Sequence, residues 1–161
     1  MAKGDEICES EEVVRAAMYP YWDADQGRGT PSAFAATEVS VSRLAICDLE
    51  QIISIFKADF DGRVHPDGSS MDIRGFGQGR VASIISQAET PMQNSTELPN
   101  VVLTVNEDPI SNETGVTNNP SHALICGWDR ENPSQPRKIS RGVAKRLLNI
   151  FSWNPLPPQA M

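Results

Sequence analysis

Apolar and polar side chains alternate along residues 37–46 with the period of a β-strand. Val39 and Val41 fall on one face of this segment, and Ser40 and Ser42 fall on the other. Successive side chains of a strand point to opposite faces of its sheet, so the valines and the serines meet different surroundings. The alternation predicts a half-buried strand.

Four shorter apolar runs also have the character of strands. The run 13–19 is closed by Pro20 and carries Arg15 within an otherwise apolar segment. The other three span 81–86, 101–105 and 122–128, and the first two of these are rich in β-branched residues. The pattern therefore predicts about five strands.

Two segments repeat apolar residues every three or four positions, which is the spacing of one helix face. The first begins after Asp48, and Gln51 follows three residues later as a capping box requires, so we expect a helix over about 48–59. The second predicted helix spans 139–151. The apolar stripes are Leu49, Ile52, Ile53 and Phe56 in the first helix and Ile139, Val143, Leu147 and Ile150 in the second.

The chain has 161 residues, with 12 prolines and 11 glycines gathered between the periodic segments, which favours long loops and short elements. This length fits one domain. We predict a loop-rich α+β fold with a mixed or antiparallel sheet and two main helices over 13–151. Residues 1–12 are expected to form a flexible acidic tail, and residues 152–161 a Pro-rich C-terminal tail.

Charge is unevenly spread along the chain. The net charge is −7, but residues 1–127 carry −11 and residues 128–161 carry +4. An acidic body repels phosphate backbones, so broad nucleic-acid binding is disfavoured. The basic residues Arg141, Lys145 and Arg146 of the second helix are candidate binding residues for an acidic partner or for phosphate, or they form a solvated face.

No apolar run reaches 18 residues, and the first twelve residues lack the basic start and apolar stretch of a secretory signal. We therefore expect no membrane association and a cytoplasmic location. A protein partner or a homo-oligomer fits the opposed charges of the two ends.

His65 and His122 are the two histidines of the chain and the first candidates for proton transfer. His65 lies in a Gly-rich loop with Asp, Arg and Ser neighbours, which is typical of a catalytic loop and also of a solvated turn. His122 lies where a loop enters a strand, a position that suits a general base or a histidine bound to a backbone carbonyl. An acid and base pair requires both imidazoles to reach one substrate.

The remaining candidates would support those histidines. Arg15 or Arg43 would hold an anion, and Ser40 or Ser42 would orient it. Together with His122 and His65 they predict a small hydrolase or transferase for a phosphorylated or nucleotide substrate.

Metal and cofactor motifs are lacking in the sequence. His122 and Cys126, four apart on a predicted strand, lie roughly 13 Å apart, too far for one zinc ion. Pro66 stands where a calcium loop beginning at Asp61 needs glycine. The run 75–80, Gly-Phe-Gly-Gln-Gly-Arg, favours a hairpin or bulge over a phosphate loop, because a strand is expected to follow it. We predict no metal and no cofactor.

Arg15 on its apolar strand, Pro31-Ser32-Ala33-Phe34, and Asn119-Pro120-Ser121-His122-Ala123 before a basic helix give an order of motifs over residues 13–151. This order resembles a set of small uncharacterised bacterial proteins. The resemblance implies a bacterial or mobile-element accessory protein and adds weight to His122 and Ser40. The sequence thus favours first an accessory protein acting through a protein partner, with the hydrolase or transferase as the alternative and the question of enzymatic activity open.

Overall fold

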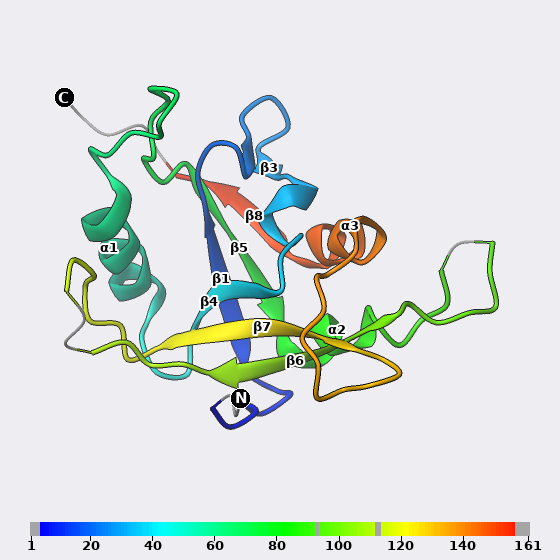
Figure 1. Ribbon diagram of the computed structural model, residues 1–161. Helices are drawn as coiled ribbons and strands as arrows, with labels where there is room; N and C mark the ends of the chain where they lie inside the picture. The colour runs from blue at the N-terminus through cyan, green and yellow to red at the C-terminus, as the bar shows by residue number, and fades with distance from the viewer. Residues whose placement is uncertain (1–3, 93, 112–113, 157–161) are drawn as a thin grey trace.

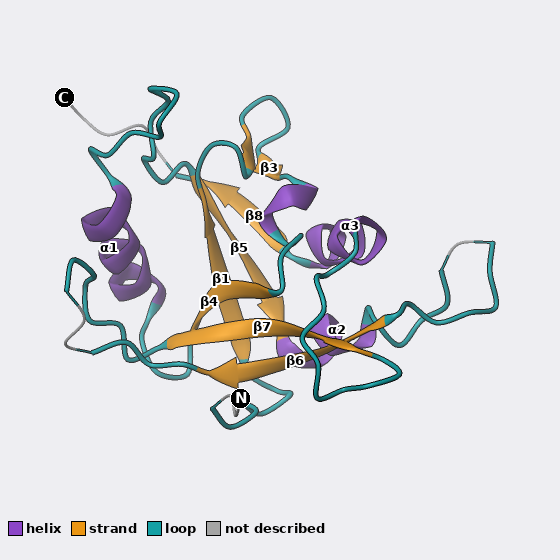
Figure 2. Ribbon diagram, in the orientation of Figure 1, coloured by secondary structure: helices purple, strands orange, loops and turns teal. Residues whose placement is uncertain are grey.

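The computed structural model describes residues 4–92, 94–111 and 114–156. Across these residues the chain forms strands, helices and one 3-10 turn, η1, around a single main sheet (Figures 1 and 2). This confirms the predicted α+β class. The elements are β1 (Glu12–Ala17), β2 (Trp22–Asp23), β3 (Arg28–Gly29), η1 (Pro31–Ala33), β4 (Glu38–Arg43), α1 (Leu49–Phe60), β5 (Gly75–Arg80), α2 (Val81–Ser86), β6 (Val101–Glu107), β7 (His122–Asp129), α3 (Arg141–Ile150) and β8 (Ser152–Pro155).

The main sheet is antiparallel and has six strands in the order β6-β7-β4-β1-β5-β8, while β2 and β3 form a separate small ribbon. β1 pairs with β5 along its whole length. Its ladder with β4 covers only Val13–Arg43 and Val14–Ser42. Beyond these pairs the two strands part, and Figure 1 shows β4 and β7 crossing β1 steeply. The middle of the sheet is therefore open on the β4 side of β1.

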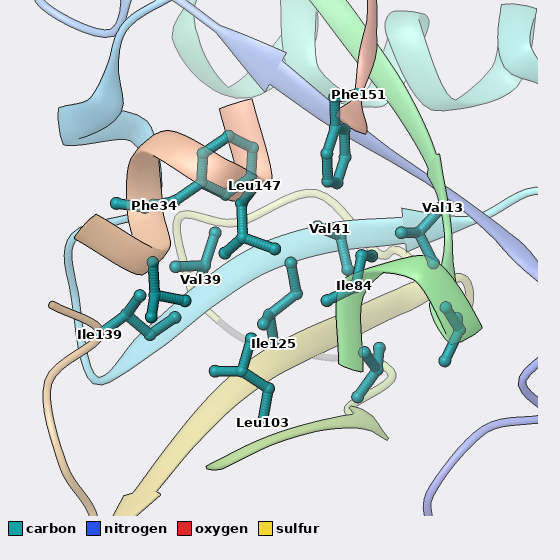
Figure 3. Packing of buried hydrophobic residues seen from close by; sticks show 14 of the residues in the cluster. Val13, Phe34, Val39, Val41, Ile84, Leu103, Ile125, Ile139, Leu147 and Phe151 are labelled. Carbon is teal, nitrogen blue, oxygen red and sulfur yellow. The ribbon is translucent and has the colours of Figure 1, made fainter. Parts of the chain in front are cut away.

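The larger apolar core lies on the sheet face that α2, α3 and η1 cover. Val39 and Val41 of β4 and Ile125 of β7 are fully or almost fully buried there, against Phe34 and Leu147 (Figure 3). The valine face of the alternating segment is thus the core face, as the period of two requires.

The opposite face holds a smaller apolar cluster beneath α1. Val14 of β1 packs there with Ile52 and Phe56 of α1, and with Ile73 from the loop before β5. Figure 1 shows α1 on the other side of β1 from α3. The serine face of β4 turns toward this side.

Local signals explain why both long helices form where they do. Asp48 caps α1 by accepting a hydrogen bond from the Gln51 backbone, and the Gln51 side chain accepts one from the Asp48 backbone. Ser140 caps α3 by accepting from Val143. The buried stripe of α3 includes Ala144 and Leu148, whereas Ile150, which the sequence places in the stripe, is only partly buried.

The strand predicted for residues 81–86 is wrong, because these residues form the short helix α2. Their β-branched content favours a strand, but Val81 and Ile84 lie three apart on one helix face and are both fully buried in the core. Tertiary packing therefore decides this segment over intrinsic preference.

The glycine run 75–80 is a strand of the main sheet, not a hairpin or bulge. A β-carbon at Gly77 would lie 2.8 Å from the Trp153 ring, and one at Gly79 would lie 2.9 Å from the Phe151 ring. A β-carbon at Gly75 would overlap the Trp22 ring. Alternate glycines thus let aromatic rings lie directly on the β5 backbone, which excludes a phosphate loop here.

Both segments expected to be tails contribute ordered structure within the described residues. Ile7 is buried and its amide donates to the Val105 carbonyl, so the N-terminal segment lies along the edge strand β6. At the other end, β8 pairs with β5 and places Trp153 over the glycines. Within the described part of the chain, no helix is both long and apolar enough to cross a membrane.

Candidate active site

A pocket of about 380 Å³ lies beside the opening between β1 and β4. The main sheet, α1 and three loops contribute to its walls. Its polar lining residues are Arg15, Ser40, Asp59, His65, Asn119 and His122. Four of these were named from the sequence as candidate site residues. The pocket thus brings together polar groups that lie far apart in the sequence.

Arg15 contributes a guanidinium that has no carboxylate partner among the described residues. Its Nε donates to the Ala33 carbonyl and its Nη1 to the Ser40 carbonyl, each at 3.2 Å. The side chain fills the place where the β1–β4 ladder stops, and it lies 5.6 Å from the centroid of the Tyr21 ring. Two backbone acceptors therefore fix its orientation, and no described residue binds Nη2.

Burial lowers the pKa of Arg15 to about 10, and the neighbouring Tyr21 partly opposes that effect. The guanidinium is still protonated at neutral pH. Arg15 is partly buried, and no described carboxylate neutralises its charge. An anion bound in this part of the pocket would neutralise it.

His122 has one ring nitrogen fixed by Asp108. Nδ1 lies 2.9 Å from the Asp108 carbonyl oxygen and 3.1 Å from its carboxylate Oδ2. A carbonyl oxygen only accepts, so Nδ1 carries the proton and donates. Nε2 is then the basic nitrogen, and no described residue binds it. The side chain is only 10% exposed, which suits a general base oriented by a carboxylate.

The turn before His122 is built from buried polar groups. Asn119 Oδ1 accepts from both the backbone amide and the hydroxyl of Ser121, at 3.1 and 2.6 Å. Its Nδ2 donates to the Ser42 hydroxyl at 3.2 Å. This network holds the start of β7 against β4 and so fixes the backbone that carries His122.

His65 reaches the same pocket from the loop after α1. Its Nε2 lies 2.8 Å from the Tyr19 carbonyl oxygen and therefore donates to it. Its Nδ1 has no partner among the described side chains and backbone groups. The ring also packs edge-on against Tyr19 at 6.3 Å between centroids. Both imidazoles thus line one cavity, each anchored through one nitrogen and open at the other.

The two serines of β4 have different surroundings. Ser42 is fully buried and its hydroxyl is engaged by Asn119, so it belongs to the supporting network. Ser40 lines the pocket, and its backbone carbonyl binds Arg15. No described group binds the Ser40 hydroxyl, which leaves it available to a ligand.

Arg43, the other arginine suggested as an anion holder, is engaged by carboxylates. Its Nε and Nη2 each lie 2.8 Å from a different Glu11 oxygen, and its Nη1 lies 3.7 Å from Glu107. These contacts raise the pKa of Arg43 and lower that of Glu11. Arg43 is not among the residues lining the pocket.

The three basic residues suggested on α3 also lie away from the pocket. Arg146 donates to the backbone carbonyls of Gln87, Thr90 and Pro91 and thereby holds the segment after α2. Arg141 and Lys145 are exposed. Arg141 instead borders a separate hollow with Lys138 and Ser32.

Sequence reasoning missed two carboxylates of the site. Asp59 follows Phe56 by three residues on α1, and its Oδ1 accepts from the Thr117 backbone at 2.9 Å. A carboxylate on the apolar face of a helix is a signal that the sequence does carry. No sequence pattern points to Asp108. It lies next to His122 because the β6–β7 register pairs the adjacent residues Glu107 and Ala123.

The described residues contain no group of three or more His, Cys, Asp or Glu side chains arranged to hold a metal ion. The six polar residues that line the pocket provide one arginine cation, two histidines, one serine hydroxyl, one asparagine amide and one carboxylate.

No family model, curated protein or solved structure matches the chain in comparisons with known proteins. The resemblance to bacterial accessory proteins therefore stays a prediction. The function must be argued from the pocket itself.

Proposed function

We propose that the protein is a small hydrolase or transferase that acts on a phosphorylated or nucleotide substrate in the pocket between β1 and β4. One observation carries the proposal: Arg15, a cation without a carboxylate partner among the described residues, shares a pocket with a histidine oriented by Asp108. An anion site next to a general base is what transfer from a phosphoester requires.

Each residue has a role that its contacts suit. Arg15 Nη2 and the Ser40 hydroxyl bind the non-bridging oxygens of the phosphate. Asp108 keeps the proton on His122 Nδ1, so that Nε2 accepts a proton from the attacking water or acceptor hydroxyl. That oxygen attacks phosphorus as the bond to the leaving oxygen breaks. His65, protonated on Nδ1 and held through Nε2 by Tyr19, gives its proton to the leaving oxygen.

A phosphoester panel tests this proposal with the full chain. We expect His122→Asn to lower kcat by about 10²–10⁴-fold, the usual contribution of a positioned acid or base. Asp108→Asn should lower kcat less, because the Asp108 carbonyl still binds Nδ1. Arg15→Met should mainly raise KM. Arg141→Met, on the exposed face of α3, is the matched control and should change neither constant.

If the folded wild-type protein turned over none of the phosphoesters in the panel, the proposal would be refuted. Equal activity of His122→Asn and the wild type would refute the assigned base. Thermal unfolding of each variant separates loss of chemistry from loss of fold.

The accessory function that the sequence favours first is a second proposal. It is supported by Tyr19 and Val64, which are 53% and 65% exposed and lie beside His65. Exposed apolar side chains that gather on a surface often contact a partner. Copurification of one partner with the wild type, and not with a Tyr19→Ser, Val64→Ser double variant, would support it. Retention of the same partner by that variant would count against it.

A further inference from the structure

The two halves of the pocket differ in chemistry. The strand side supplies Arg15, Ser40 and His122, from β1, β4 and the start of β7. The helix and loop side is mainly apolar. Its apolar residues are Met18, Phe56, Phe60, Met71, Ile110 and Val116. A ligand that fits both halves carries its charge at one end and an apolar body at the other.

The charges of the pocket limit the ligand to one anionic group. Arg15 is the one cationic side chain among the lining residues apart from the histidines. On the opposite half, Asp59 adds a carboxylate next to Phe60. A second phosphate at that end would be repelled by Asp59 and would find no counter-ion.

Size points the same way. Pockets for small molecules span about 300–1,000 Å³, so a volume of about 380 Å³ lies near the lower limit. One ring system with one phosphate fits such a space, and a dinucleotide does not.

The apolar half also distinguishes between the possible bodies of a monophosphate. A sugar or glycerol body would place hydroxyls against phenylalanine and methionine side chains, and a hydroxyl buried without a hydrogen-bond partner is unfavourable. An aromatic body would bury its faces against the same side chains. Phe56 and Phe60 lie nearly parallel, with centroids 6.4 Å apart, and thioethers make favourable contacts with rings.

We infer that the substrate is an aryl monophosphate, with the phosphate on Arg15 and the ring against Phe60. The phosphate end of this inference rests on the proposed function. The aromatic end rests on the helix and loop side of the pocket alone. Asp59 is the group that can bind a polar atom on the edge of the ring.

Calorimetric titration of the full chain with three probes tests the inference: phenyl phosphate, glycerol 1-phosphate and inorganic phosphate. We expect phenyl phosphate to bind at least about tenfold more tightly than glycerol 1-phosphate. Phe60→Ser should remove that preference and leave the affinity for inorganic phosphate unchanged. Leu49→Ser, on the same helix but outside the pocket lining, is the matched control and should keep the preference.

The outcomes separate the inference from the proposed function. Tight binding of phenyl phosphate without turnover of any aromatic phosphate supports the inference and refutes the enzyme. Equal binding of phenyl phosphate and glycerol 1-phosphate refutes the inference, whatever the activity. Binding of none of the three probes refutes both. Arg15→Met should lose affinity for all three, and an unchanged affinity would place the anion elsewhere.

Discussion

The two faces of the main sheet are filled in opposite ways. On the face covered by α2 and α3, Val39, Val41 and Ile125 pack into a closed apolar core. On the α1 face, a smaller apolar cluster borders a pocket that holds charged and polar groups. A single strand, β4, serves both through its alternating valines and serines. The face under α2 and α3 thus holds the larger apolar core, and the face under α1 holds the candidate site.

Two arginines on neighbouring strands repeat this contrast. Arg43 is held by Glu11 and lies close to Glu107. Arg15 has only backbone carbonyls and an aromatic ring around it among the described groups. The charge of Arg43 is neutralised within the protein, whereas no described carboxylate neutralises the charge of Arg15, which a bound anion would do.

The largest stability effect is expected on the core face. Ile125→Ala removes a fully buried side chain and should lower the free energy of unfolding by about 3–4 kcal/mol. Met71→Ala, on the pocket face, should cost only about 1 kcal/mol because Met71 is partly exposed and already borders a cavity. Urea denaturation measures both. Equal losses in the free energy of unfolding for the two variants would contradict the expectation that the core face is the more tightly packed.

Gly77→Ala should lower the free energy of unfolding by about 2 kcal/mol. The new β-carbon would lie 2.8 Å from the Trp153 ring, so the ring or the strand must shift. Gly62→Ala is a useful comparison, because nothing crowds that position and its cost comes only from its positive φ of 83°. If Gly77→Ala unfolded at the same temperature as the wild type, the Trp153 ring would be shown to move aside without loss of stability.

Arg43→Met should cost about 2 kcal/mol by leaving Glu11 unpaired, somewhat less than the loss of a fully buried pair. The same pair predicts a pH effect. The hydrogen bonds from Arg43 lower the pKa of Glu11 below its ordinary value, so this stabilisation is present above the unfolded-state pKa and is lost as the pH falls through the folded-state pKa. Urea denaturation across this pH range should show a steeper loss for the wild type than for Glu11→Gln. Parallel curves would contradict the pairing.

The smallest effect is expected at Arg15. Arg15→Met removes an unfavourable buried charge but also two hydrogen bonds to backbone carbonyls. The two changes nearly offset each other, so the free energy of unfolding should rise by about 1 kcal/mol or stay the same. Calorimetric unfolding without added anions measures this. A loss as large as that of Arg43→Met would show that Arg15 is structural.

Local signals predict much of the fold. The capping pair Asp48 and Gln51 predicts α1, and the serine and valine alternation predicts β4 with its two faces. Residues 81–86 were misread because the buried spacing of Val81 and Ile84 becomes apparent only when the core is assembled. The strand at the β5 glycines could not be predicted from local sequence, because the Trp153 ring that packs on them lies more than 70 residues away in the chain.

The residue types of the candidate site could be predicted from the sequence, but their arrangement in space could not. An arginine in an apolar run and a histidine at a strand end are unusual enough to mark Arg15 and His122. Their meeting depends on where the β1–β4 ladder stops, which no local pattern encodes. Asp108 reaches His122 only through the strand register across a long loop, so a sequence shows the members of the site without their arrangement.

The early end of the β1–β4 ladder has a mechanical consequence. The ladder between β1 and β4 joins the half-sheet β6-β7-β4 to the half-sheet β1-β5-β8 through only the pairs Val13–Arg43 and Val14–Ser42. An anion bound by both Arg15 of β1 and Ser40 of β4 would link the two half-sheets. Amide hydrogen exchange in β1 and β4 near this link should then slow when the anion binds, while exchange along the fully paired β1–β5 ladder changes little.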